Sequence, residues 1–213
     1  MSLEQFLTRQ FPGLELRNPL FYSWPVGIRF ELGVSDGTAS IHDQPAYLPG
    51  VYHRAIDLFE ALHAPEDDLY IVVDVHEFNS SHAQRRQLNV FAKYVKERSV
   101  LYRLRQDTFS SVYLEDDEDG SYRKHRFSLR CSRSDLRYAA LLRAICNQDM
   151  GKRPVVDVPV YVVNMTEQTV FHIYDDRGCD VIAAEADTLR PVYAWFSDWI
   201  LEYDRAAVDG VFG

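Results

Sequence analysis

The sequence predicts an α+β fold, with an antiparallel or mixed sheet and helices packed mainly on one face of it. Residues Leu69–Val75 are nearly all apolar, as in a strand that is covered on both faces. Apolar and other residues alternate from Val26 to Val34, which predicts a half-buried strand. Apolar residues recur at helical spacing in Val51–Leu62 and in Thr188–Asp204. Strand and helix patterns therefore both run through the chain.

The first half of the chain contains further elements. Ser2 and Gln5 have the spacing of a capping box, which predicts a short helix that ends before Pro12-Gly13. Residues 35–50 are rich in Gly, Pro and Asp and predict a long loop. A Ser80 or Ser81 cap predicts a helix that continues to Val95.

In the second half, Phe109–Leu114 and Tyr122–Cys131 are predicted strands on either side of an acidic turn. Ser134 is the predicted cap of a helix that runs to Asn147. The chain has no internal repeat and no Gly/Ser linker, so residues 1–213 are expected to form a single domain. The acidic loop near residues 115–120 is the only expected seam.

Residues 159–184 predict a three-strand meander that ends in a hairpin at Val170–Ala183. Its turn, Asp175-Asp176-Arg177-Gly178, suits a type I turn in which Gly178 takes a positive φ. If Asp175 pairs with Cys179, then Ile173 faces Val181 and Phe171 faces Ala183 on one apolar face.

The other face of this hairpin predicts a candidate binding site. It carries an imidazole, a phenol and a carboxylate, and further charged groups lie at the tip and at the end of the following helix. A well-formed structural turn with packed side chains is the alternative interpretation, and no catalytic residue is assigned. The candidate binding residues are His172, Tyr174, Asp175, Asp176, Arg177, Asp180 and Asp204.

A second group of candidate site residues is basic. Lys124, Arg126 and Arg130 share one face of the predicted strand Tyr122–Cys131, and Arg103 is expected nearby. They are candidate contacts for a phosphate, an acidic protein surface or RNA. The alternative is an edge strand that is charged to prevent aggregation. His76, Glu77 and His82 lack the HExxH spacing of a zinc site, so no metal and no cofactor are predicted.

Composition restricts the function further. No apolar run approaches the ~20 residues that span a membrane, and no signal peptide is evident. Three scattered cysteines suggest a reducing cytoplasm. Residues 85–153 hold 16 of the 23 Lys and Arg residues and 9 of the 32 Asp and Glu residues, a net +7. The remaining 7 basic and 23 acidic residues give −16, so the charge is strongly polarised and suited to steering a charged partner.

The C-terminal motifs carry a family resemblance. Tyr174–Gly178 reads YDDRG, and Trp199–Arg205 reads WILEYDR. With these motifs the chain resembles domain-of-unknown-function family 3885, a group of uncharacterised bacterial proteins, over most of its length. The resemblance implies no established activity. It is loosely associated with genes near polymorphic toxins, which implies an immunity or accessory role.

Two functions are carried forward from the sequence. The first is a cytoplasmic, non-enzymatic binding protein, of the toxin-immunity type, whose acidic surface takes a basic partner such as a nuclease toxin. Nucleic acid and membrane partners are disfavoured by the net charge of −9 and by the missing apolar run. The alternative is a small-ligand binder or hydrolase-type enzyme centred on the YDDRGCD hairpin.

Overall fold

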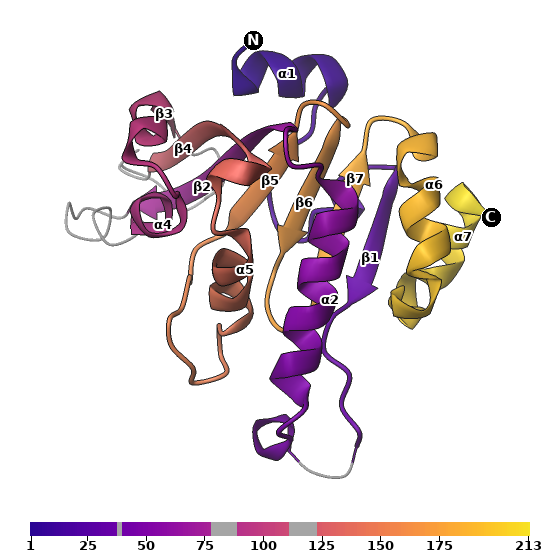
Figure 1. Cartoon of the computed structure of the whole chain (residues 1–213). Helices are drawn as coiled ribbons and strands as arrows, with labels where there is room; N and C mark the ends of the chain where they lie inside the picture. The colour runs from indigo at the N-terminus through magenta and orange to yellow at the C-terminus, as the bar shows by residue number, and fades with distance from the viewer. Residues whose placement is uncertain (38–39, 78–88, 111–122) are drawn as a thin grey trace.

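The structure is a computed structural model of the chain, and it describes residues 1–37, 40–77, 89–110 and 123–213 (Figure 1). A seven-stranded sheet forms its centre, with strand order β1-β7-β6-β5-β2-β4-β3. All six neighbouring pairs are antiparallel. The strands are β1 (Gly27–Glu31), β2 (Asp68–Glu77), β3 (Leu104–Ser110), β4 (Arg123–Ser132), β5 (Val160–Asn164), β6 (Thr169–Ile173) and β7 (Gly178–Ala183).

Helices cover the two faces of the sheet unequally. The larger core lies between one face and the helices α2, α4, α5, α6 and α7, and α2 crosses that face in Figure 1. A smaller core covers part of the opposite face, where α1 and the following segment, residues 11–24, pack on the central strands. The helices are α1 (Leu3–Gln10), α2 (Tyr47–Leu62), α4 (Asn89–Tyr94), α5 (Tyr138–Cys146), α6 (Ala186–Trp195) and α7 (Arg205–Phe212).

Local sequence explains where several helices begin and end. The capping box of α1 is present, because the Ser2 hydroxyl accepts from the amide of Gln5 and the Gln5 side chain accepts from the amide of Ser2. The cap before α5 differs from the prediction. Ser132 caps a short 3₁₀ turn, Arg133–Asp135, and α5 begins only at Tyr138.

The long helix predicted over Thr188–Asp204 is shorter in the structure. It begins earlier, with Glu185 as its N-cap, and α6 ends at Trp195. Two 3₁₀ turns follow, Ser197–Trp199 and Glu202–Asp204, before α7. Between these turns Leu201 donates its amide to the carbonyl of Arg29, so the chain leaves the helix to cover the outer edge of β1.

The hairpin forms as predicted, but its register is shifted by two residues. Ile173 pairs with Cys179 and His172 pairs with Asp180, whereas the prediction paired Asp175 with Cys179. Gly178 does not take a positive φ. It is the first residue of β7, and an added Cβ there would lie 2.1 Å from the Tyr174 hydroxyl and 2.6 Å from the Phe30 carbonyl oxygen. Glycine is needed for close approach rather than for turn geometry.

The strand that carries the basic residues, β4, is not the edge strand that one of the two interpretations predicted. β4 lies between β2 and β3, so it is an interior strand and the edge position belongs to β3. The acidic loop near residues 115–120 and His82 lie outside the described residues, as do the side chains of His76 and Glu77. Within the described ranges, every helix is too short or too polar to span a lipid bilayer.

Candidate functional site

A row of polar side chains crosses the sheet on the face that α1 and residues 11–24 partly cover. Arg29 on β1 pairs with Asp180 on β7, Asp180 pairs with His172 on β6, and His172 pairs with Tyr161 on β5. We call these four residues the polar row. Because side chains alternate along a strand, all four project from the same face of the sheet. The row contains two of the predicted site residues, His172 and Asp180.

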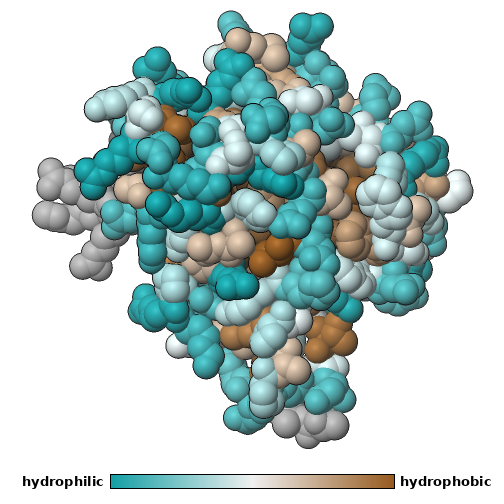
Figure 2. Space-filling view, in the orientation of Figure 1, coloured by the Kyte–Doolittle hydropathy of each residue, from teal (hydrophilic) through white to brown (hydrophobic). Residues whose placement is uncertain are grey.

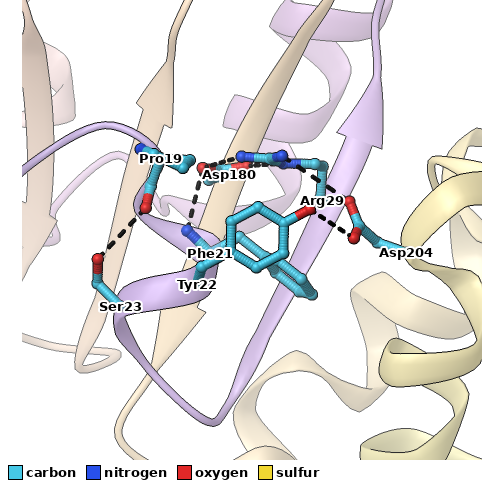
Figure 3. Close-up of polar contacts among 7 residues, drawn as sticks. All are labelled: Pro19, Phe21, Tyr22, Ser23, Arg29, Asp180 and Asp204. Atoms are coloured by element: carbon cyan, nitrogen blue, oxygen red, sulfur yellow. Dashed lines mark hydrogen bonds and ion pairs between the residues drawn. The ribbon is translucent and has the colours of Figure 1, made fainter.

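The first half of the polar row is a buried ion pair (Figure 3). Arg29 donates from Nε to Asp180 Oδ1 at 2.7 Å and from Nη2 to Asp180 Oδ2 at 3.0 Å. The backbone amide of Phe21 donates to the same Oδ2 at 3.0 Å. Asp180 is fully buried, so these three hydrogen bonds satisfy a carboxylate that water does not reach.

The remaining side of Arg29 faces Asp204, whose Oδ2 lies 3.8 Å from Nη1. Asp204 Oδ1 accepts a hydrogen bond of 2.7 Å from the Tyr22 hydroxyl. The guanidinium also lies over the rings of Tyr22 and Tyr174, 4.8 and 5.3 Å from their centroids. We call these residues the Arg29 cluster: Arg29, Asp180, Asp204, Tyr22 and Tyr174. The cluster joins the N-terminal segment, the edge strand, the hairpin and the C-terminal region.

Burial and neighbouring charges shift the pKa values of Arg29, Tyr22 and Tyr174 in this cluster. Burial opposes the charge of Arg29, but the hydrogen bonds and the negative charge of Asp180 outweigh burial and raise its pKa. The hydrogen bond to Asp204 raises the pKa of Tyr22, and burial raises the pKa of Tyr174. Both phenols therefore keep their protons at pH 7, and Tyr22 donates its proton to Asp204.

His172 is a neutral, buried imidazole. Its exposed fraction is 2%, its Nδ1 lies 2.9 Å from the carbonyl oxygen of Val160, and its ring stacks on Tyr161 with centroids 4.3 Å apart. Burial lowers its pKa, which favours the neutral form. One ring nitrogen of His172 is hydrogen-bonded to a backbone carbonyl, and the ring is buried against Tyr161. This environment is typical of a histidine that stabilises the core.

The tip of the hairpin is held by internal contacts. Asp175 accepts from the amide and the guanidinium of Arg177, and Asp176 accepts a hydrogen bond of 2.6 Å from the Tyr47 hydroxyl on α2. The Arg177 carbonyl accepts from the amide of Leu32. Only the Arg177 side chain projects from the tip, with 75% of it exposed.

The four predicted anion contacts divide into two groups. Lys124 and Arg126 converge on Asp74 of β2: Lys124 Nζ lies 2.8 Å from Oδ2, and Arg126 makes two hydrogen bonds of 2.8 Å to the carboxylate. Arg126 Nη1 also donates to Glu4 at 3.1 Å. Burial would raise the pKa of Asp74, but the hydrogen bonds and charge of Arg126 outweigh it and lower that pKa.

Arg103 and Arg130 line an open groove of about 780 Å³ at the end of β2 and β4. Arg130 is paired there with Asp68 at 2.5 Å. Arg103 and the neighbouring Arg105 make no ion pair with any residue that the structure describes.

Sequence reasoning missed Arg29, Tyr22, Tyr47 and Asp74 as partners of the predicted residues. Arg29 stands in an alternating strand at a position typical of a solvent-facing residue, and Asp74 interrupts an apolar strand. The interruption at Asp74 is a usable signal, because a buried carboxylate requires a cationic partner. Nothing local signals that Tyr22 meets Asp204, which is 182 residues away.

The chemistry that this arrangement permits is limited. Asp180 is saturated by its donors, and the imidazole next to it is neutral. Among the described residues, no group of three or more His, Cys, Asp or Glu side chains is placed to hold a metal ion. Neither the groove at the end of β2 and β4 nor the hollow beneath residues 15–18 is lined by His172 or Asp180. The geometry of the hairpin face thus favours a structural role over catalysis.

Comparison with known proteins identifies the family. The chain matches a family described as domain of unknown function (DUF3885) over residues 3–204. It is 30% identical over 211 residues to the uncharacterized protein YnaE of Bacillus subtilis (strain 168), and the match covers 95% of this chain and 99% of that protein. No solved structure is significantly similar to the chain. The chain therefore belongs to the DUF3885 family.

Proposed function

We propose that the protein is a non-enzymatic binding protein whose C-terminal helical layer, residues 185–213, docks a basic protein partner. The observation that supports this most directly is a pair of large aromatic side chains left exposed on that layer. Trp195 is 71% exposed and Tyr203 is 87% exposed. Trp and Tyr are enriched at the centres of protein interfaces, because they contribute a large contact area for a small loss of side-chain entropy.

The charge of the layer favours a basic partner. Residues 185–213 contain six Asp or Glu and two Arg residues, a net charge of −4. Both arginines are already held by internal contacts: Arg190 by Asp187 and the Phe212 carbonyl, and Arg205 by Glu202 and the Ser197 carbonyl. The side of the molecule formed by α6 and α7 is mostly polar in Figure 2. Such a surface steers cations and disfavours acidic proteins.

The polar row supports the same proposal because its residues are poorly placed for the alternative, a hydrolase. The carboxylates and the imidazole that a hydrolase would need are buried and hydrogen-bonded within the fold. A general base needs access to substrate, and His172 is only 2% exposed. A role as an immunity or accessory protein of the cytoplasm, paired with a basic toxin such as a nuclease, is one form that this function would take.

Capture from the lysate of the native cell tests the proposal. Three tagged full-length baits are compared: wild type, Trp195→Ala/Tyr203→Ala, and the control Tyr102→Ala, which removes an aromatic ring that is 88% exposed but lies outside the layer. We expect a basic protein to bind the wild type and the control at low salt and to be released at high salt. The double variant should retain less than about a tenth of it, because hot-spot residues contribute about 2 kcal/mol or more.

Purified partner and bait should then form a stoichiometric complex, and co-expression should suppress any toxicity of the partner. The proposal fails if no basic protein is captured, or if the double variant captures it as well as the Tyr102→Ala control does.

A further inference from the structure

A small cavity lies beneath the N-terminal segment, and the proposed function does not use it. It has a volume of about 270 Å³ and lies on the face of the sheet that carries the polar row. Its floor comes from three adjacent strands, through Asp74 on β2, Lys124 on β4 and Tyr161 on β5. Residues 15–18 cover it, and Pro159 completes the wall. Rigid strands thus present two charged groups and one phenol to a partly open hollow.

Without the half-exposed Glu4, the charges around Asp74 do not balance. Asp74 is 3% exposed and is paired with two cations, Lys124 and Arg126. Glu4 offsets Arg126 on the side away from Asp74, but its side chain is 45% exposed and water weakens that interaction. Lys124 therefore brings an excess positive charge to the cavity wall. Its ammonium has three N–H donors, and Asp74 is its only ion-pair partner among the described residues.

Tyr161 adds a second donor. The residue is 2% exposed, and its hydroxyl donates to no residue that the structure describes. Burial raises the pKa of this phenol, so the proton stays on the oxygen at neutral pH. Because Tyr161 lines the cavity, its hydroxyl can donate to a ligand there without breaking an internal hydrogen bond. Tyr161 is held in place by its stack on His172, so the donor is preorganised.

The cover is close to neutral. Glu15 and Arg17 lie 4.0 Å apart at their nearest charged atoms, and both side chains are more than half exposed. Asn18 contributes an amide that can donate or accept. The negative charge of Glu15 is therefore largely offset by its neighbour, and the charge of the cavity is decided by its floor.

We propose that this cavity binds a small oxyanion, held by the Lys124 ammonium and the Tyr161 hydroxyl, with Arg17 and Asn18 at its rim. The volume is below the ~300–1,000 Å³ of sites for drug-sized ligands, so the ligand is orthophosphate or a small carboxylate rather than a nucleotide. Phosphate and carboxylate oxygens accept the same donors, and charge-assisted hydrogen bonds to them are short and strong.

Isothermal titration calorimetry of the full-length protein tests this inference, with sodium phosphate, sodium succinate and sodium chloride compared at matched ionic strength. We expect one-to-one saturable binding of phosphate or succinate and no binding of chloride. The anion that binds shows whether the ligand is a phosphate or a carboxylate. Tyr161→Phe should weaken binding about tenfold or more, the loss of one hydrogen bond to a charged group. This variant removes an oxygen that no internal hydrogen bond uses, so the fold should be retained.

Lys124→Met should abolish binding, and Lys152→Met, which removes an exposed lysine elsewhere, should leave it unchanged. If Lys124→Met fails to fold, as judged by circular dichroism, Tyr161→Phe decides alone. The proposal is overturned if neither oxyanion gives saturable heat up to about 10 mM, tenfold above a Kd of about 1 mM. It is also overturned if Tyr161→Phe binds as tightly as the wild type.

Discussion

Replacing Asp180 by Asn should destabilise the protein far more than an equally conservative change at the surface. The substitution keeps the shape of the side chain but leaves the buried Arg29 without its main counter-charge. Three hydrogen bonds to the Asp180 carboxylate become weaker or lose their acceptor. Only 12% of the Arg29 side chain and none of Asp180 is exposed, so water can replace little of the lost interaction.

Removing one partner of such a buried pair costs about 3–5 kcal/mol. For a chain of this size each kcal/mol lowers Tm by about 2–4 °C, so the expected decrease is about 6–20 °C. Asp187→Asn is the matched control, because Asp187 pairs with Arg190 but is 91% exposed. Its expected cost is below about 0.5 kcal/mol.

Urea denaturation followed by circular dichroism measures both variants. The double variant Arg29→Met/Asp180→Leu should recover only part of the loss, because it removes both charges of the pair but leaves the buried Asp204 without its cation. The reasoning about the Arg29 cluster is refuted if Asp180→Asn and Asp187→Asn differ by less than about 1 kcal/mol.

Three further predictions concern other buried groups. Burial lowers the pKa of His63 to about 4, so the unfolded chain protonates first as pH falls; stability should drop by about 2 kcal/mol from pH 7 to pH 5, and His63→Gln should show a smaller drop by urea denaturation. Burial raises the pKa of Cys131 to about 12, and all three thiols are buried, so a thiol reagent should label the protein only after unfolding. Gly178→Ala should destabilise by about 1–3 kcal/mol through its contact with Tyr174, whereas Gly50→Ala, in open space on α2, should stabilise by up to about 1 kcal/mol; equal thermal shifts would contradict the contact.

Sequence patterns predicted which side chains share a face of the sheet better than they predicted which residues those side chains contact. His172 and Asp180 were expected on one face of the hairpin, and they remain together because a register shift of two residues preserves the alternation. Arg29 was expected to face solvent, because an alternating pattern does not reveal that Phe21 and Tyr22 return over the same face. Local patterns determine which residues share a face, whereas the segment that covers the face depends on contacts distant in sequence.

The covering of β1 has a consequence for synthesis of the protein. Gly27 pairs with Ile182, 155 residues further along the chain, and the other edge of β1 is closed by residues 200 and 201. At translation rates of about 5–20 residues per second, this strand waits about 8–30 s for its partner. During that time its apolar residues, Ile28 and Phe30, have no sheet to join. A chain that stops before residue 178 would release a nascent product with an unpaired strand, which chaperones and proteases recognise.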